Sequence, residues 1–576
     1  MHRHLAIIWI ALLCFALPAL GATIPVSDDD CTIEEAILSA NTDSGQGGCE
    51  AGSGADTIVL PAGKFLISQG HEIIGDVSFV GQGQDNTIID GQNGDYRFIK
   101  VSGSVSLSGL TISRFNTKSH IAPLEVNEGS ELNLLDVTIR KNEGVVGAIS
   151  TDGYVSVSAS TITDNISTRN ANNVTPTGHL LLHNSSVVNN TTTGGGGTIL
   201  CLGTMQITRS TISTNMPRIG GVISTTGFTS ARGSVQILSS TIAFNKATER
   251  GTGGIDDGGT VTMRNSILAN NWNRDGKEAN CDGELNSGGY NILHNVQGCN
   301  IIDRSDTDRD EDPMLDRELR ALGGTTLMHR PLPGSPAINN GAPDDFGMEG
   351  SCPRFDQRHL RRLGPCDIGA VEVGAALVVF DPTHLGPGDQ EMEKRLKDEL
   401  AFETVRDTLT DTPATAGKNL VIISESAPSA VAGKSFRNIP VPVLVIEPQA
   451  FDEMYMTGAN PDDFGVSPGQ ESVWIKTKRR MTADLIGKVT TTKNAARYAF
   501  GRTLATGAKC LAWANESSTR CMIFRIGKGQ SLFNRMRAPA RRVGFFSVGE
   551  TFTDLTADGL RLFDGSVLWA AQGESQ

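Results

Sequence analysis

The chain has 576 residues, of which 65 are glycine and 5% are aromatic, and its length predicts three or four domains at most. The formal net charge is −14, which argues against a nucleic-acid partner because binding to phosphates requires an excess of Lys and Arg. Beyond the N-terminus the sequence has no apolar run of about 18 residues, so no membrane-spanning helix is predicted in the mature chain.

The N-terminus has the features of a secretory signal. His2, Arg3 and His4 precede an apolar stretch over residues 5–20, and a small residue, Gly21, follows it. This pattern predicts a signal peptide over residues 1–21 that is removed on export. We therefore expect a secreted protein, extracellular or on the outer cell surface, with the periplasm as the alternative.

Nine cysteines remain in the mature chain, and eight of them fall into pairs that are close in the sequence. The pairs are Cys31 with Cys49, Cys281 with Cys299, Cys352 with Cys366, and Cys510 with Cys521. None of these spacings is the short one of zinc sites, so four disulfides in an oxidising compartment are predicted. Cys201 lies alone in an apolar run and is predicted to be a buried free thiol.

A short pattern that ends in an apolar residue repeats through the first half of the chain. These apolar residues, the anchors, are Ile112, Ile139, Ile162, Val187, Ile212, Ile242 and Ile267. An asparagine follows each of them, at Asn116, Asn142, Asn165, Asn190, Asn215, Asn245 and Asn270. A period of about 25 residues is typical of a solenoid, whereas a propeller blade needs about 40–45.

The pattern within each repeat favours strands over helices. Runs such as Tyr154–Ser158 alternate apolar and polar residues, as strands with one buried face do. We therefore predict a right-handed parallel β-helix with about 25 residues per coil. The recurrent asparagines are predicted to stack into a ladder of amides that pairs with buried backbone groups at one corner of each coil.

Two further motifs resemble known bacterial families. Residues 31–41 and 54–63 resemble the N-terminal cap of the CSLREA family, although Thr32, Ile33 and Glu34 depart from its motif. Residues 312–315, 334–338, 356–358 and 367–370 resemble the choice-of-anchor Q segment. The resemblance implies a secreted or surface protein with a pectate-lyase-like fold and no defined activity. It predicts a cap over 22–75, repeats over 76–300 and a second cap over 301–373.

Residues 374–576 have a different pattern and a different charge. Residues 1–373 contain 26 basic and 41 acidic residues, whereas residues 374–576 contain 24 basic and 23 acidic ones. Continuous apolar runs over 376–380, 419–423, 441–446 and 542–546 alternate with helical patterns, including one over 388–400. We predict a doubly wound, flavodoxin-like α/β domain. It weakly resembles ThuA-like and class I glutamine-amidotransferase-like domains, but it lacks a free cysteine for amidotransferase chemistry.

Three groups of polar residues are candidate sites. Asp381, Ser424 and Glu447 each follow a predicted strand, where α/β domains bind ligands, and capping of turns is the alternative role. Asp256 and Asp257 form the best local pair for acid–base or metal chemistry, in a glycine-rich turn. A calcium loop is possible at Asp306, Asp308, Asp310 and Asp312, although a solvated acidic loop fits the departures from the EF-hand template.

These observations support two hypotheses for function. The first is a non-catalytic module that binds an extended polymer, such as a glycan or a cell-surface component, along the repeated face of the β-helix. The second is a polysaccharide lyase or glycoside hydrolase of the same fold. The acidic solenoid and the irregular positions of its arginines favour a neutral polymer or a protein surface as the partner.

Overall fold

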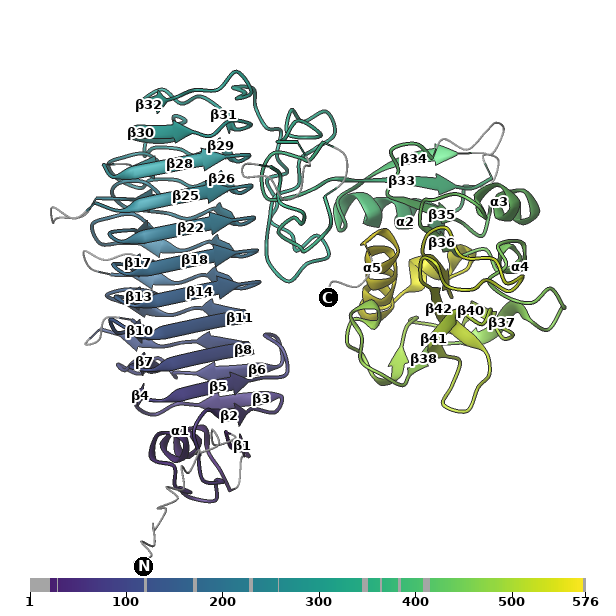
Figure 1. The fold of residues 1–576 in the computed structure, drawn as a ribbon, viewed down its shortest axis with the longest axis horizontal. Coiled ribbons are helices and arrows are strands. Elements are labelled where there is room, and N and C mark those ends of the chain that lie inside the picture. The colour runs from purple at the N-terminus through teal and green to yellow at the C-terminus, as the bar shows by residue number, and fades with distance from the viewer. Residues whose placement is uncertain are drawn as a thin grey trace, which may run out of the picture.

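The computed structural model describes residues 21–27, 30–118, 122–168, 174–226, 232–256, 258–343, 351–362, 365–381, 385–407 and 415–572. The predicted signal peptide lies outside this part of the chain except for Gly21. The structure consists of a parallel β-solenoid of about 14 turns, with about 25 residues per turn, and a C-terminal domain beside it (Figure 1). The predicted solenoid and its period are confirmed. None of the helices in the described ranges is long and apolar enough to cross a membrane.

The strands of the solenoid stack into three long sheets, and we name them by their position. The front sheet faces the viewer in Figure 1. It contains β2 (Asp56–Val59), β5 (Asp76–Val80), the first half of β8 (Ser104–Ser113) and of β11 (Glu131–Arg140), β14 (Tyr154–Ser158), β18 (His179–His183), β22 (Thr204–Thr208), β25 (Ser234–Leu238), β28 (Thr260–Arg264), β30 (Cys281–Ser287) and β32 (Cys299–Ile302), with β1 (Thr23–Pro25) beside β2.

The second sheet is called the covered sheet, because a later segment packs over part of it. It contains β3 (Gly63–Leu66), β6 (Thr87–Asp90), the ends of β8 and β11, β15 (Thr161–Thr163), β19 (Ser186–Val188), β23 (Thr211–Ser213), β26 (Thr241–Ala243), β29 (Ile267–Ala269) and β31 (Ile292–Leu293).

The third sheet, the side sheet, lies at the left of the solenoid in Figure 1. It contains β4 (His71–Ile73), β7 (Ile99–Val101), β10 (Leu124–Val126), β13 (Ile149–Thr151), β17 (Val174–Pro176), β21 (Ile199–Leu200), β24 (Ile223–Ser224), β27 (Ile255–Asp256) and the start of β30. A narrow corner ladder between the covered and side sheets contains β9 (Asn116–Thr117), β12 (Glu143–Gly144), β16 (Ile166–Ser167) and β20 (Thr191–Thr192).

Alternation of side chains builds the core of the solenoid. In β14, Val155 and Val157 point inward and are fully buried, whereas the residues between them face outward. The anchors stack in one column along the covered sheet, from Ile112 in β8 to Ile242 in β26. In the next turn Ile242 pairs with Leu268, so the predicted anchor Ile267 is wrong by one residue.

The asparagine ladder is present, with two corrections. Side-chain amides link Asn142, Asn165, Asn190, Asn215, Asn245, Asn271 and Asn280 in sequence, with nitrogen-to-oxygen distances of 2.8–3.0 Å. Asn116 is not a member, because Phe115 occupies its position and donates its backbone N–H to Asn142. Asn270 is not a member either: its φ of 55° makes it the left-handed corner residue that precedes the ladder position.

Removing one amide from this ladder tests its contribution to stability. Asn215 is fully buried, and it accepts hydrogen bonds from the backbone and side chain of Asn190. We expect Asn215→Ala to lower the free energy of unfolding by about 1–3 kcal/mol, because its buried partners lose their hydrogen bonds. Urea unfolding followed by circular dichroism measures this change. Asn133→Ala on the front sheet is the control and should stay within about 0.5 kcal/mol of the wild type.

The N-terminal end of the solenoid is closed by a short helix. Helix α1 (Ile33–Thr42) begins with a capping box between Thr32 and Glu35 and contacts β1, β2 and β4. Ile33, Ala36 and Ile37 are buried against the first turns. The helix overlaps residues 31–41, which resembled the N-terminal cap motif, and the Cys31–Cys49 disulfide lies at its start.

The four predicted cysteine pairs are confirmed. The Cα atoms are 4.7 Å apart for Cys31–Cys49, 5.5 Å for Cys281–Cys299, 6.5 Å for Cys352–Cys366 and 5.8 Å for Cys510–Cys521. Cys201 is free and fully buried, as predicted. Burial raises the pKa of the Cys201 thiol to about 11, so it is protonated and unreactive at neutral pH.

The segment predicted to cap the C-terminal end lies mostly along the side of the solenoid. Its first part closes the last turn, where Arg309 bridges to Ile292 in β31. The described residues of the following segment, 313–343, 351–362 and 365–372, then pack on the outward hydroxyls of the covered sheet, and we name them the strap. Gln357 lies at the centre of this contact and bonds to Ser186 and Thr211 at 3.1 and 2.6 Å.

The strap also contacts the C-terminal domain through a buried arginine. The Arg358 guanidinium lies 2.8 Å from the carboxylate of Asp356, and both side chains are at most 1% exposed. The same guanidinium donates to the carbonyls of Leu322 in the strap and Leu400 in the C-terminal domain, at 3.1 and 3.0 Å. The motif that resembled choice-of-anchor Q thus forms a buried contact that joins the two parts of the chain.

The C-terminal domain is a mixed sheet with few helices, which corrects the predicted doubly wound fold. Its parallel part has the order β34 (Phe402–Asp407), β33 (Gly374–Val379), β35 (Leu420–Ile423), β36 (Val443–Val445) and β43 (Arg542–Phe545). Its antiparallel part contains β37 (Phe464–Gln470), β38 (Ser472–Ile475), β39 (Gly487–Thr490), β40 (Ala496–Gly501), β41 (Ala508–Trp513) and β42 (Cys521–Ile526).

Helices lie on both faces of this sheet. Residues of α2 (Pro387–Asp398) and α5 (Ala557–Gln572) pack into one apolar cluster, and residues of α3 (Ser429–Phe436) and α4 (Ala450–Glu453) pack into the other. Two short 3₁₀ helices are η1 (Arg480–Thr482) and η2 (Gly549–Asp554). The predicted strands and the helix over 388–400 are present. The prediction failed over residues 464–526, where short connections between strands produce antiparallel pairs.

Candidate functional site

The outward face of the front sheet forms two continuous columns of side chains over eight turns. Strand register places the first column at Asp76, Ser104, Glu131, Tyr154, His179, Thr204, Ser234 and Thr260. The second column is Ser78, Ser106, Asn133, Ser156, Leu181, Gln206, Gln236 and Thr262. At a strand spacing of about 4.8 Å, the eight strands span about 34 Å.

This face is exposed and nearly uncharged. Of the sixteen positions, Asp76 and Glu131 carry charge, and most of the others present hydroxyl or amide groups. All sixteen are exposed or half-buried, and no described segment crosses them in Figure 1. The strap packs on the covered sheet instead, so the described segments leave the front sheet open as a long flat surface. Such a surface suits an extended partner with many hydroxyl groups.

One pair of rings lies in the middle of the first column. The centroids of Tyr154 and His179 are 6.5 Å apart, and the next residue in the column, Thr204, has its hydroxyl 2.5 Å from His179 Nδ1. Aromatic rings on a polar surface offer apolar area with polar edges. The ring pair therefore adds a stacking position to the row of hydroxyl and amide groups.

The predicted acidic pair lies on the side sheet. Asp256 ends β27 and is in register with Ser224 in β24 and Asp282 in β30. A Cβ atom at Gly220 would lie 2.9 Å from Asp256 Oδ2, so the chain packs closely around this carboxylate. Asp257 lies outside the described residues. A catalytic role for the pair stays a prediction.

The acidic run after β32 is engaged in turns. The carboxylate of Asp308 accepts hydrogen bonds from Ser287, Asn291 and Ser305 at 2.5–3.1 Å. Asp310 lies 3.8 Å from Arg304, Asp312 accepts the backbone N–H of Met314, and Asp306 is exposed in the same turn. In the described ranges, no three His, Cys, Asp or Glu side chains are grouped to hold a metal ion. Calcium binding by this run stays a prediction.

The candidates in the C-terminal domain lie where the parallel strands end. Asp381 follows β33, Ser424 follows β35, and Glu447 follows β36. The Ser424 hydroxyl donates to Asp389 in the first turn of α2, and Ser426 donates to the same carboxylate at 3.1 Å. Asp389 also accepts the backbone N–H of Gly386. These bonds tie the start of α2 to the end of β35, which is the capping role considered as the alternative.

Glu447 is a buried carboxyl, 6% exposed. Burial, together with the charge of Glu425, raises the pKa of Glu447 to about 7, and the backbone N–H of Gln449 donates to it at 2.7 Å. A carboxyl with this pKa can exchange a proton near neutral pH. Sequence reasoning identified Glu447 and Ser424 but missed Asp389 and Ser426. An acid in the first turn of a helix that begins Gly386-Pro387 is the signal for Asp389.

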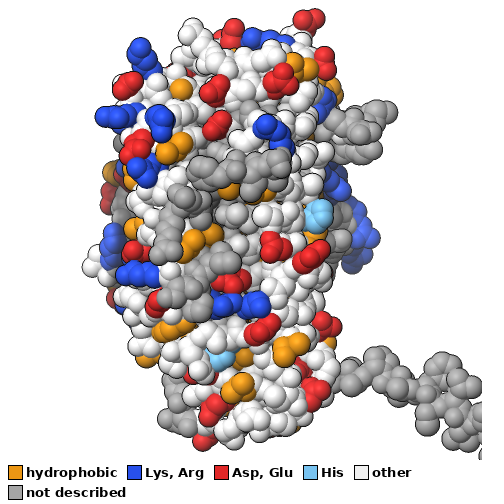
Figure 2. All heavy atoms as spheres, turned by 90° about the vertical axis from the view of Figure 1, so that its left-hand side faces the viewer, with side chains coloured by type: hydrophobic (Ala, Val, Ile, Leu, Met, Phe, Trp, Pro, Cys, Tyr) orange, Lys and Arg blue, Asp and Glu red, His pale blue; other side chains and the backbone are white. Residues whose placement is uncertain are grey.

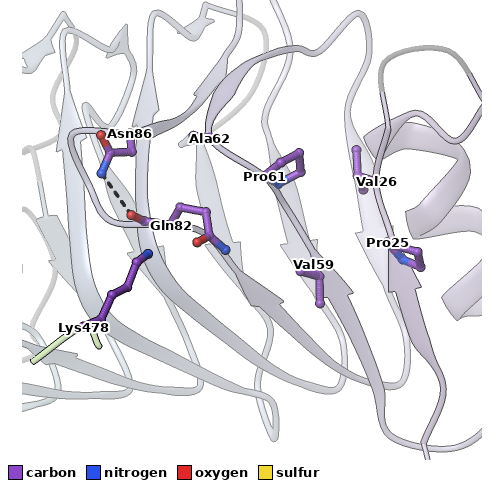
Figure 3. Close-up of a pocket in the computed structure, with 8 residues that line it drawn as sticks. All are labelled: Pro25, Val26, Val59, Pro61, Ala62, Gln82, Asn86 and Lys478. Carbon is purple, nitrogen blue, oxygen red and sulfur yellow. Dashed lines mark hydrogen bonds between the residues drawn. The ribbon is translucent and has the colours of Figure 1, made fainter. Parts of the chain in front are cut away.

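A shallow cleft of about 510 Å³ lies where the C-terminal domain meets the first turns of the solenoid (Figure 3). Its lining residues are Pro25, Val26, Val59, Pro61, Ala62, Gln82, Asn86 and Lys478. Lys478 reaches from the C-terminal domain toward Gln82 and Asn86. The lining residues include no carboxylate, so the cleft offers one cation over a largely apolar floor and no acid–base pair.

Several arginines of the coils are engaged in structural contacts. Arg114 lies 2.5 Å from the buried carboxylate of Asp90, which Lys64 also contacts at 2.6 Å. These two cations hold the pKa of Asp90 below its usual value against the effect of its burial. Arg97 pairs with Glu125 in the same region. A cation held this close to a carboxylate is charged and does not serve as the base that a lyase requires.

The comparisons with known proteins give little beyond the geometry. No family model matches the chain, and no curated protein matches it. Among solved structures, the chain matches a variant of AlyGC, an alginate lyase of the PL6 family. The match covers 73% of this chain and 67% of that chain at 10% identity, with a TM-score of 0.20. At this TM-score the match carries no argument about fold or activity.

Proposed function

We propose that this protein is a secreted or cell-surface β-helix that binds an extended, neutral glycan or similar cell-surface polymer along its front sheet. The observation that carries the proposal is the flat, open and nearly uncharged surface of two columns over eight turns. A long ligand can contact equivalent hydroxyl and amide groups in successive turns, and each weak contact adds to the next.

The location rests on two features. Four disulfides suit an oxidising compartment, where they form and persist. The N-terminal 21 residues have the pattern of an export signal. The resemblances of the two end segments to the CSLREA and choice-of-anchor Q families agree with this location and are part of the proposal. The domain limits at residues 75, 300 and 373 are also part of the proposal. The weak likeness of residues 374–576 to ThuA-like and amidotransferase-like domains is part of the proposal as well.

The alternative function, a polysaccharide lyase or glycoside hydrolase, requires a carboxylate cluster with a free base beside it. Asp256 on the side sheet is the remaining candidate for such a cluster. We expect no cleavage of acidic glycans, with or without calcium. Formation of an unsaturated product that Asp256→Ala abolishes would establish the lyase instead.

Binding to the front sheet is tested with immobilised neutral polysaccharides, for example cellulose, xylan and β-glucan, and the purified mature chain. We expect retention on at least one of them. The double variant Tyr154→Ala, Gln206→Ala should weaken retention about tenfold or more, because it removes a ring and an amide from adjacent columns. Thr519→Ala, an exposed change in the C-terminal domain, should bind as the wild type does. Equal binding by all three proteins would exclude the front sheet.

A further inference from the structure

A group of cations lies at one corner of the solenoid, away from the front sheet. In three successive turns, this corner continues the narrow corner ladder and leads into the side sheet. Its cationic members are Arg218, Lys246, Arg250, Arg274 and Lys277, and we call the group the basic corner. Figure 2 shows several Lys and Arg side chains along the upper left margin of the solenoid, with Asp and Glu side chains among them.

Backbone bonds between adjacent turns hold these residues together. Glu249 donates its N–H to the carbonyl of Arg218, and Arg250 accepts the N–H of Gly220. Lys246 is bridged to Trp272 in the following turn. Arg274 and Lys277 lie in a tight turn that is closed by the bond from Asn273 N to Lys277 O. Adjacent turns are about 4.8 Å apart, so the cations form a ridge along the solenoid axis.

Most of this positive charge is not neutralised by the protein. Lys246, Arg250, Arg274 and Lys277 are exposed, and none of them forms an ion pair with a described residue. Arg218 is the exception, since it lies 2.9 Å from Glu249. The local positive charge is notable in a chain whose formal net charge is −14. The corner also holds Glu249 and the exposed Asp275, so its five cations leave a local excess of three positive charges, which attracts anions.

Apolar side chains lie among the cations. Met216 is 43% exposed, and the half-buried Trp272 packs against Phe244 at a ring distance of 5.9 Å. Lys246 and Trp272 are direct neighbours across the turns. An indole beside ammonium groups can contact the apolar face of a sugar ring while the cations contact its acidic groups. A simple phosphate polymer has no such ring to contact.

We propose that the basic corner binds an acidic polysaccharide, such as a polyuronate, lengthwise along the solenoid. This surface is separate from the front sheet and does not depend on the neutral ligand proposed for it. The irregular arginine positions in the sequence predicted no continuous basic stripe along the solenoid. Lys246, Arg250, Arg274 and Lys277 were not recognised as a group, because they lie in the turns and not beside the anchors. Binding here involves no cleavage, since the ridge carries cations and no catalytic pair.

Affinity electrophoresis in polygalacturonate gels tests the proposal with the full mature chain. We expect retardation that falls with added salt. The double variant Lys246→Glu, Arg250→Glu should weaken binding at least about tenfold. Lys394→Glu, Lys528→Glu changes the net charge equally at exposed sites in the C-terminal domain and should bind as the wild type does. Trp272→Ala should also weaken binding to polygalacturonate.

Two comparison ligands separate the sources of anionic charge. Polyphosphate and vesicles containing phosphatidylglycerol should bind more weakly than polygalacturonate, and Trp272→Ala should leave their binding unchanged. Absence of binding to polygalacturonate at low salt would overturn the proposal, as would equal weakening by the two double variants. Stronger binding to polyphosphate or vesicles would replace the polysaccharide with that anion. Loss of binding to neutral glycans on changing Tyr154 and Gln206 leaves this test unaffected.

Discussion

The variant Ile212→Asp is expected to unfold the turns around β23, with a loss of several kcal/mol in the free energy of unfolding. Ile212 is fully buried and stacks between Val187 and Ile242 in the column of anchors. A carboxylate at this position has no partner in the apolar core, and burying an unpaired charge is strongly unfavourable. Each turn packs on its two neighbours, so the damage should spread beyond a single turn.

Thermal unfolding and hydrogen exchange measure the effect and its extent. The matched control is Gln236→Asp, which places the same carboxylate on the exposed face of β25. We expect the control to unfold at nearly the wild-type temperature. Protection of amides should fall first in β19, β23 and β26 of the variant. If Ile212→Asp and Gln236→Asp had equal stability, the assignment of inward and outward residues would be wrong.

The solenoid could be predicted from the sequence because each turn repeats the same physical requirement. An inward anchor followed three residues later by a corner asparagine is a local pattern, and it recurs in six successive turns of the structure. The two errors have local causes. At the first corner Phe115, and not Asn116, occupies the ladder position. Near the last corner two asparagines are adjacent, and spacing alone did not show which of them is the ladder member. The structure distinguishes them, because Asn270 has φ 55° and Asn271 bonds to Asn245.

A second ladder in the solenoid was missed. Ser160, Ser185, Ser210, Ser240 and Ser266 accept, through their hydroxyls, the backbone N–H of the equivalent residue in the preceding turn at 3.0–3.1 Å. The serines were visible in the sequence, four of them immediately before a Thr-Ile or Ser-Val pair and Ser266 before Ile-Leu. They were interpreted as part of a strand pattern, although buried hydroxyls at a constant offset signal hydrogen bonding as strongly as asparagines do.

The position of the strap could not be predicted from local pattern. Its contacts join residues more than 100 positions apart, such as Gln357 with Ser186 and Ala370 with Thr241. The same limit applies to the C-terminal domain, where the order of strands depends on pairs distant in sequence. Among the candidate sites, Glu447 and Ser424 were predicted from strand ends. Their neighbour Asp389 comes from a helix that the topology brings back to that edge.

The strap provides the second prediction of large effect, at Arg358. Its guanidinium is almost fully buried between the Asp356 carboxylate and three backbone carbonyls, those of Leu322, Glu372 and Leu400. Arg358→Met keeps much of the apolar volume but leaves the buried Asp356 without its counter-ion. Removing one partner of a buried pair costs about 3–5 kcal/mol. We therefore expect a loss of that size in the free energy of unfolding.

The location of Arg358 predicts which part of the protein responds. Leu400 belongs to the C-terminal domain, and Gln357, the residue before Arg358, bonds to the covered sheet. Loss of the arginine should therefore release the C-terminal domain from the solenoid before the solenoid itself unfolds, since the solenoid keeps its own ladders. Limited proteolysis should then cut within residues 313–372, and small-angle scattering should show a larger radius of gyration. Arg361→Met, an exposed change three residues away, is the control and should alter neither measurement. An unchanged radius in Arg358→Met, with cleavage no faster than in Arg361→Met, would show that other contacts hold the two parts together.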